Sequence, residues 1–207
     1  MEMPSTRALD FHSHDAVAEL AFAEGGYPRL TPALLRELQA LLGEILWGGL
    51  FRGVVIAPGA KSFATGAAID EVTTLVGTSG RAFSALGQEI FEQIVSYPLP
   101  VVAAIGGYCL GGGFDLALAC HARVATYDAC LGYPGGALGL ITGWGGTQRL
   151  PRLIGQAAAL QIFLTGERIP ATQALTLGVV DELVSASDLV EAAVRRALRM
   201  ADRPAQP

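Results

Sequence analysis

The chain has 207 residues, a length that fits one compact domain and leaves little room for two. Hydrophobic residues make up 51% and charged residues 16% of the sequence, and this composition excludes a disordered protein. The formal net charge is -5 and the basic residues do not cluster, so we expect no nucleic-acid partner.

Predicted strands and helices alternate along the chain. The strands are short apolar runs, and the helices carry apolar residues on one face with polar residues opposite. In chain order we predict strands at 16–22, 53–57, 99–105, 122–126 and 179–184, and helices at 34–45, 83–95, 111–119, 146–153, 156–164, 171–175 and 187–200. Thr31 and Pro32 precede the first helix as its N-cap and first-turn proline. Apolar strands with helices between them indicate an α/β fold whose sheet is covered by helices.

The chain has no internal repeat or long linker, which predicts a single unit. The predicted core covers residues 1–186, and we expect residues 1–15 within it to be flexible. A short C-terminal helix and tail occupy residues 187–207, where the last residues are expected to fray.

The cysteines and the N-terminus predict where the protein acts. Cys109, Cys120 and Cys130 form no CxxC pair, so we expect small buried thiols in a reducing compartment. The N-terminus lacks the apolar run of a secretory signal, and we therefore expect a cytoplasmic protein. Two uncharged stretches, 93–114 and 129–148, contain glycines and prolines that would break a membrane helix, so we expect no membrane span.

Common cofactor and nucleophile motifs are absent from the sequence. It contains no GxxxxGK[ST] phosphate loop, no GxGxxG after a strand and no GxSxG elbow. His12 and His14 flank Ser13 near the N-terminus without a third ligand, and His121 follows a cysteine at a strand start. We therefore predict no metal site.

Two glycine-containing segments, 63–68 and 111–115, each follow a buried strand and lead into a helix start. The N–H groups at a helix start are unpaired, so two such starts directed at one place would stabilise a developing oxyanion. Each donor could contribute about 3 kcal/mol of transition-state stabilisation. The alternative is that these glycines only allow tight turns and close packing.

Five sequence blocks occur in a fixed order: KSFATGA at 61–67, PVVAAIGG at 100–107 leading into LGGGFDLA at 110–117, GLI at 139–141 with GWGGTQRL at 143–150, LTGE at 164–167, and ALTLGVV at 174–180. Together they resemble the crotonase superfamily of enoyl-CoA hydratases and isomerases, over about residues 16–186. The resemblance implies a spiral of ββα units, here with a shortened C-terminal helical region, assembled as a homotrimer or hexamer. It also implies a substrate that is an acyl-CoA or acyl-carrier thioester, whose carbonyl is held in an oxyanion hole.

The resemblance assigns the oxyanion hole to the N–H groups of Ala67 and Gly112. Two fixed donors favour any reaction through a thioester enolate, because the carbonyl oxygen gains negative charge as the enolate forms. The other residues that we expect at the substrate are Lys61, Ala64, Ala68, Ile69, Gly135 and Trp144. For Lys61 the alternative is a solvated loop charge, and for Trp144 it is simple packing.

Hydratases of the family carry two glutamates, and this chain has Asp115 and Gly135 at those positions. Addition of water to a double bond needs a base for the water and an acid for the α-carbon. Asp115 could fill one role, or it could only oppose the helix dipole in the first turn. Gly135 cannot transfer a proton.

We expect an enoyl-CoA hydratase-type lyase of fatty acid metabolism, with Asp115 catalytic and with no metal or redox cofactor beyond the coenzyme A of the substrate. An isomerase, decarboxylase or thioester hydrolase of the same superfamily is the first alternative. A catalytically weak thioester-binding subunit is the second, because Gly135 and Ala68 depart from the family and only residues 181–207 follow the last block.

Overall fold

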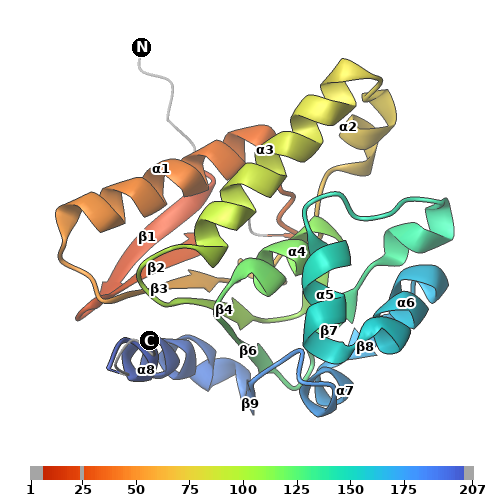
Figure 1. The fold of residues 1–207 in the computed structure, drawn as a ribbon. Coiled ribbons are helices and arrows are strands. Elements are labelled where there is room, and N and C mark those ends of the chain that lie inside the picture. The colour runs from red at the N-terminus through yellow and green to blue at the C-terminus, as the bar shows by residue number, and fades with distance from the viewer. Residues whose placement is uncertain (1–6, 24–25, 203–207) are drawn as a thin grey trace.

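The computed structural model describes residues 7–23 and 26–202, apart from the side chain of Ile69. A six-stranded main sheet forms its centre (Figure 1). In spatial order its strands are β1 (Leu9–His14), β2 (Val17–Phe22), β3 (Gly53–Ala57), β4 (Val101–Ile105), β6 (Ala122–Thr126) and β9 (Glu182–Val184). β1 runs antiparallel to β2, and all other neighbours in the main sheet are parallel.

A second, smaller sheet contains β5 (Tyr108–Leu110), β7 (Cys130–Gly132) and β8 (Arg168–Pro170). A parallel bridge between Ala64 and Cys109 extends this sheet by one position. The chain therefore repeats one path three times, from a main-sheet strand to the small sheet and into a helix. These turns are β3, the Ala64 bridge and α3, then β4, β5 and α4, then β6, β7 and α5. This is the predicted spiral of ββα units, and the α/β fold class is confirmed.

Helices cover both faces of the main sheet (Figure 1). They are α1 (Pro32–Gly48), α2 (Ile69–Thr74), α3 (Thr78–Val95), α4 (Gly112–Ala119), α5 (Gly146–Ile154), α6 (Gln156–Thr165), α7 (Ala171–Thr176) and α8 (Leu189–Ala201), with short 3-10 turns η1 (Pro134–Leu138) and η2 (Ala186–Asp188). None of the helices within the described ranges is long and apolar enough to cross a membrane.

Side-chain alternation along the strands creates two separate cores. Val54 and Ile56 of β3 face the large core with α1, α3 and α4, whereas Val55 faces α8. The α8 face is built from alanines, and a Cβ added to Gly53 would lie 3.0 Å from the Cβ of Ala197. Small residues thus let α8 approach the sheet closely.

The sequence predicts the start of α1 correctly. The Leu34 N–H donates to Thr31 Oγ1 at 3.2 Å, and Pro32 occupies the first turn. The helix continues beyond the predicted end and stops at Gly49, whose φ of 62° favours glycine.

Other segments differ from the sequence predictions. Residues 9–14, within the segment expected to be flexible, form β1 against β2, and residues 1–6 lie outside the described ranges. The strand predicted at 179–184 begins only at Glu182, because the N–H groups of Val179 and Val180 donate to the carbonyl of Ala174. Of the three free thiols, Cys130 is half-buried rather than buried.

Candidate active site

The two glycine-containing loops lie against each other. A Cβ added to Gly66 would lie 2.7 Å from the Gly112 nitrogen and 3.0 Å from the Leu110 carbonyl oxygen. The loops are joined by two hydrogen bonds, in which Leu110 N–H donates to Ala64 O at 2.9 Å and Ala64 N–H donates to Tyr108 O at 3.1 Å. Gly66 also has a φ of 86°, so glycine is required there for both conformation and space.

The backbone N–H groups of Ala67 and Gly112 remain free at this contact. Over residues 7–23 and 26–202, neither N–H donates to a hydrogen-bond acceptor. Their neighbours are paired: Gly111 N–H donates to Gly132 O at 2.9 Å, and Asp115 N–H donates to Gly111 O at 3.0 Å. Both residues are half-buried, so a ligand oxygen could reach donors that have lost much of their contact with water.

Asp115 lies in the first turn of α4 with no solvent exposure. Its Oδ1 accepts a hydrogen bond from the Tyr133 hydroxyl at 2.7 Å. Its Oδ2 accepts from the Thr142 hydroxyl and from the Trp144 backbone N–H, the latter at 3.2 Å. Burial raises the pKa of Asp115, while these three hydrogen bonds and the nearby Arg149 charge oppose that shift. Asp115 therefore ties α4 to the loop that contains Trp144.

The glycines of the GWGG block make room for this network. A Cβ on Gly146 would overlap the Tyr133 hydroxyl and Asp115 Oδ1, and a Cβ on Gly145 would overlap the Arg149 guanidinium. Both substitutions would displace a buried or half-buried polar group. The block is therefore explained by the side chains that pack on it, in addition to any role in tight turns.

Trp144 is wedged between two helices. A Cβ on Gly112 of α4 would overlap its six-membered ring, and a Cβ on Gly87 of α3 would overlap its five-membered ring. The indole N–H donates to the Phe83 carbonyl at 3.3 Å, and the ring centroid lies 5.7 Å from that of Phe91. Only 3% of Trp144 is exposed. The predicted packing role is thus present, at a position that directly adjoins Gly112.

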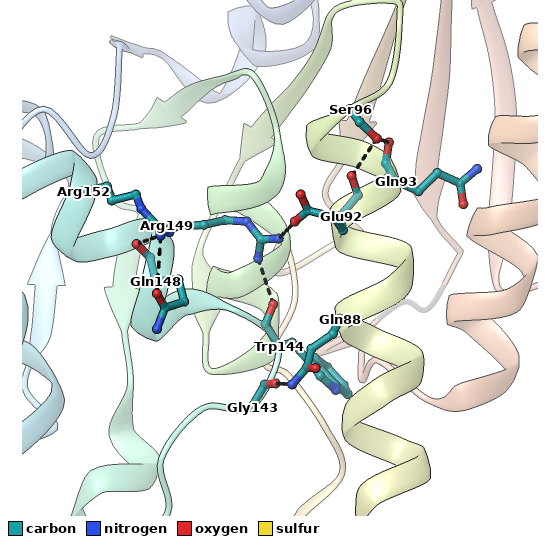
Figure 2. Close-up of polar contacts among 9 residues, drawn as sticks. All are labelled: Gln88, Glu92, Gln93, Ser96, Gly143, Trp144, Gln148, Arg149 and Arg152. Carbon is teal, nitrogen blue, oxygen red and sulfur yellow. Dashed lines mark hydrogen bonds and ion pairs between the residues drawn. The ribbon is translucent and has the colours of Figure 1, made fainter.

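Polar side chains hold the backbone around Trp144 to α3 (Figure 2). The Arg149 guanidinium donates to the Trp144 carbonyl at 2.9 Å and to the Glu92 carboxylate at 3.1 Å. Gln88, one helical turn before Glu92, donates to the Gly143 carbonyl at 2.7 Å. Arg149 therefore connects α5 with α3 inside the chain.

Gly135, at the position of the second family glutamate, lies in η1. Its carbonyl accepts from the Leu140 N–H at 2.9 Å, and an added Cβ would lie 3.4 Å from the Leu140 Cβ. Its carbonyl also accepts from the N–H of Gly139, which ends η1. The structure thus places Gly135 next to an apolar residue.

The remaining predicted substrate residues lie along the loop that follows β3. Lys61 is exposed, Ala64 is buried in the bridge to Cys109, and Ala68 is buried immediately before α2. Ile69 begins α2, and its side chain lies outside the description. Their contacts with a substrate stay predictions.

Sequence reasoning missed Tyr133 and Thr142, which hold Asp115, and Arg29, which pairs with Asp70 at 3.6 Å. Tyr133 and Thr142 lie 18 and 27 residues from Asp115, and no local spacing marks them as its partners. Of the residues that the structure describes, no three acidic, histidine or cysteine side chains gather in a group that could hold a metal ion.

Comparison with known proteins shows which family the chain resembles. The family model described as enoyl-CoA hydratase/isomerase matches residues 15–206. The fatty acid oxidation complex subunit alpha of Shewanella loihica is 47% identical over 174 residues, which are 82% of this chain but 24% of that protein. The chain thus spans about a quarter of this relative's length.

Solved structures of related proteins match the fold of this chain. A crystal structure of enoyl-CoA hydratase from Bacillus anthracis is 35% identical with a TM-score of 0.88, and the match covers 95% of this chain and 77% of that one. DspI of Pseudomonas aeruginosa is 28% identical with a TM-score of 0.90, and the match covers 98% of this chain and 78% of that one. The ββα spiral, the glycine-bordered loops and these matches establish that the chain belongs to the enoyl-CoA hydratase/isomerase family within the crotonase superfamily.

Proposed function

We propose that this protein binds acyl-CoA thioesters and stabilises their enolates, and that its reaction is the hydration of an enoyl-CoA. One observation carries the proposal: on two loops that touch, the N–H groups of Ala67 and Gly112 donate to no acceptor among the residues that the structure describes. A thioester oxygen that accepts both N–H groups would be stabilised most strongly when it carries the enolate charge. The charge is then met by the backbone, so the reaction as proposed needs no metal or redox cofactor.

A single carboxylate can serve both proton transfers of hydration if it acts twice. Asp115 accepts a proton from water while the water oxygen bonds to the β-carbon and the double-bond electrons move to the thioester oxygen. The enolate then returns its electrons to the α-carbon, which takes the proton from the Asp115 carboxyl group. The raised pKa of Asp115 supports the first step, because it makes the carboxylate a stronger base toward the proton of water.

Thr142 is the proposed route between water and Asp115. Asp115 and Tyr133 are buried, whereas Thr142 is half-buried and donates its hydroxyl hydrogen to Asp115 Oδ2. A hydroxyl group can give one proton to the carboxylate and take another from water in the same event. The Thr142 hydroxyl would therefore relay both protons, from water to Asp115 and from Asp115 to the α-carbon, so the buried carboxylate needs no direct contact with water or substrate.

The coenzyme A arm is assigned to the loop that follows β3. Lys61 is exposed there, and it is the only lysine in the sequence. Arg29 reaches the same region, because the Leu30 N–H donates to the Gly66 carbonyl at 2.9 Å. Lys61 would attract the phosphates of the nucleotide arm, and Arg29, which also pairs with Asp70 at 3.6 Å, would add to this attraction.

A second group of reactions remains a proposal for the same site. Asp115 has no exposed surface and already accepts three hydrogen bonds, and Gly135 supplies no second carboxylate. These observations would also suit isomerisation, decarboxylation or thioester hydrolysis, in which the N–H groups of Ala67 and Gly112 would still hold the carbonyl. The same observations would suit a catalytically weak thioester-binding subunit.

We also propose a trimer or hexamer that uses an apolar surface beside the site. A groove of about 590 Å³ between η1, α5 and α6 is lined in part by Leu140, Ile141, Leu160 and Leu164. Leu164 is 71% exposed, and apolar surface of this kind is typical of interfaces. Sedimentation of the protein and of Leu164→Glu tests this, since a monomer in both cases would contradict it.

The three unpaired thiols are compatible with the proposed cytoplasmic location.

The deciding experiment measures hydration of crotonyl-CoA by the loss of enoyl thioester absorbance. We expect turnover, and a decrease of about 10²- to 10⁴-fold in Asp115→Asn. Asp128→Asn, in an exposed turn, is the matched control and should behave as the unaltered protein. Undiminished turnover in Asp115→Asn would contradict the role of this carboxylate. Turnover of only saturated, isomerisable or decarboxylating esters would select the alternative reactions, and binding without any turnover would select the binding subunit.

A further inference from the structure

The Trp144 indole packs against Gly112, the residue whose backbone N–H is proposed to bind the thioester oxygen, on the side where a Cβ would stand. The overlap of an added Gly112 Cβ with the six-membered ring means that the ring lies in van der Waals contact with the Gly112 backbone. The opposite edge of the indole meets Gly87 in the same way. Because both positions are glycine, the Trp144 indole fits between α3 and α4 at Gly87 and Gly112.

The indole is fixed in this position by contacts at both ends. The indole nitrogen donates to the Phe83 carbonyl, and the backbone N–H of Trp144 donates to Asp115 Oδ2. Its carbonyl accepts from Arg149, which in turn binds Glu92 of α3 (Figure 2). Rotation of the side chain would break the indole hydrogen bond and leave a void between two helices.

The position of a thioester follows from the proposed hydrogen bonds. An oxygen bound by the Gly112 N–H lies about 2.9 Å from the nitrogen, and the α-carbon is only two bonds further. The first acyl carbons therefore lie within reach of the group that packs on Gly112. An acyl chain directed toward α3 would need the space that Trp144 occupies.

We propose that Trp144 sets the size limit of the acyl group, so that the protein accepts short acyl-CoA esters and rejects long ones. This inference rests on the proposed function, because it requires a thioester carbonyl at Ala67 and Gly112. It assigns Trp144 as a specificity-determining residue and names short-chain acyl-CoA as the substrate class.

The test compares binding of butyryl-CoA and octanoyl-CoA by calorimetry, which does not depend on turnover. The unaltered protein should bind butyryl-CoA more tightly. Trp144→Ala should shift the ratio of the two affinities toward octanoyl-CoA by at least about tenfold, and Trp144→Phe by less. Trp47→Ala is the matched control, because Trp47 is 92% exposed at the end of α1, and its ratio should stay unchanged.

A second measurement covers the case in which Trp144→Ala does not fold. The sequence has two tryptophans, so Trp144 is the only one in Trp47→Phe. Butyryl-CoA should change its fluorescence, whereas binding by calorimetry without any change would overturn the inference. An unchanged affinity ratio in a folded Trp144→Ala would also overturn it and would leave the proposed function standing. Failure of the unaltered protein to bind either ester would instead overturn the proposed function, and this inference with it.

Discussion

The hydroxyl group of Tyr133 can be removed from the Asp115 network with almost no change in packing. Its ring lies between those of Phe114 and Phe163, with centroid distances of 5.0 Å and 4.9 Å, so Tyr133→Phe keeps the aromatic stack. The substitution leaves Asp115 Oδ1 without its 2.7 Å donor inside the protein. The effect on stability therefore reports one buried hydrogen bond.

A hydrogen bond to a charged group contributes about 1.5–3 kcal/mol. A loss of about 2 kcal/mol corresponds to an increase of about 30-fold in the unfolding equilibrium constant. It would lower the midpoint of thermal unfolding by about 4–8 °C for a chain of this size. Since the lost bond lowers the pKa of Asp115, the substitution should raise that pKa further.

The sign of the pH dependence follows from the direction of this shift. Burial raises the pKa of Asp115 in the folded chain, so its favourable contribution is complete below about pH 4 and is lost as the pH rises through the folded-state pKa. In Tyr133→Phe that loss should be larger at neutral pH, and the difference between the two proteins should decrease on acidification.

Urea unfolding at neutral pH and at pH values down to the ordinary aspartate range measures both quantities. Tyr127→Phe serves as the control, because Tyr127 is 65% exposed and should have almost no effect. Equal stability of Tyr133→Phe and the unaltered protein at neutral pH would refute the hydrogen bond. A cost that does not change with pH would refute the charged state of Asp115.

Three further substitutions test the neighbouring contacts. Gly112→Ala would force its Cβ into the indole ring and should cost about 1–3 kcal/mol in urea unfolding, whereas Gly43→Ala, with open space inside α1, should stabilise by up to about 1 kcal/mol. Lys61→Glu should weaken acyl-CoA binding about fivefold in low salt and less in high salt, and equal weakening by Arg36→Glu on α1 would argue for a general charge effect. Arg149→Lys keeps the charge but cannot donate to both the Trp144 carbonyl and the Glu92 carboxylate, so amide hydrogen exchange in the loop around Trp144 should be faster. An unchanged exchange rate would contradict the role of Arg149 in holding this loop to α3.

The sequence predicts best those elements in which local pattern and burial agree. β3 has the predicted bounds, because all five of its residues are apolar or glycine and buried. β1 was missed because polar residues dominate its exposed edge position. β5, β7 and β8 have three residues each, which is too short to display a period of two.

The residues of the candidate site also fall into those that the sequence identifies and those that only the fold brings together. Gly112 and Asp115 stand in one block of the sequence, and the family resemblance identifies them directly. Tyr133 and Thr142 reach Asp115 only because β7 and the loop before α5 are brought back over α4 by the spiral. Contacts of this kind depend on tertiary packing, which single-residue patterns do not contain.

The packing of Trp144 on Gly87 couples two positions that are 57 residues apart in the chain. A glycine inside a helix such as α3 costs about 0.5–1 kcal/mol relative to alanine, and the indole that fits over Gly87 offsets that cost. If a smaller residue replaces Trp144, a side chain at position 87 no longer overlaps the indole, and glycine is no longer required there. Variation at these sites should therefore be coupled, so that Gly87→Ala harms a protein with tryptophan at 144 and benefits one with a small residue there.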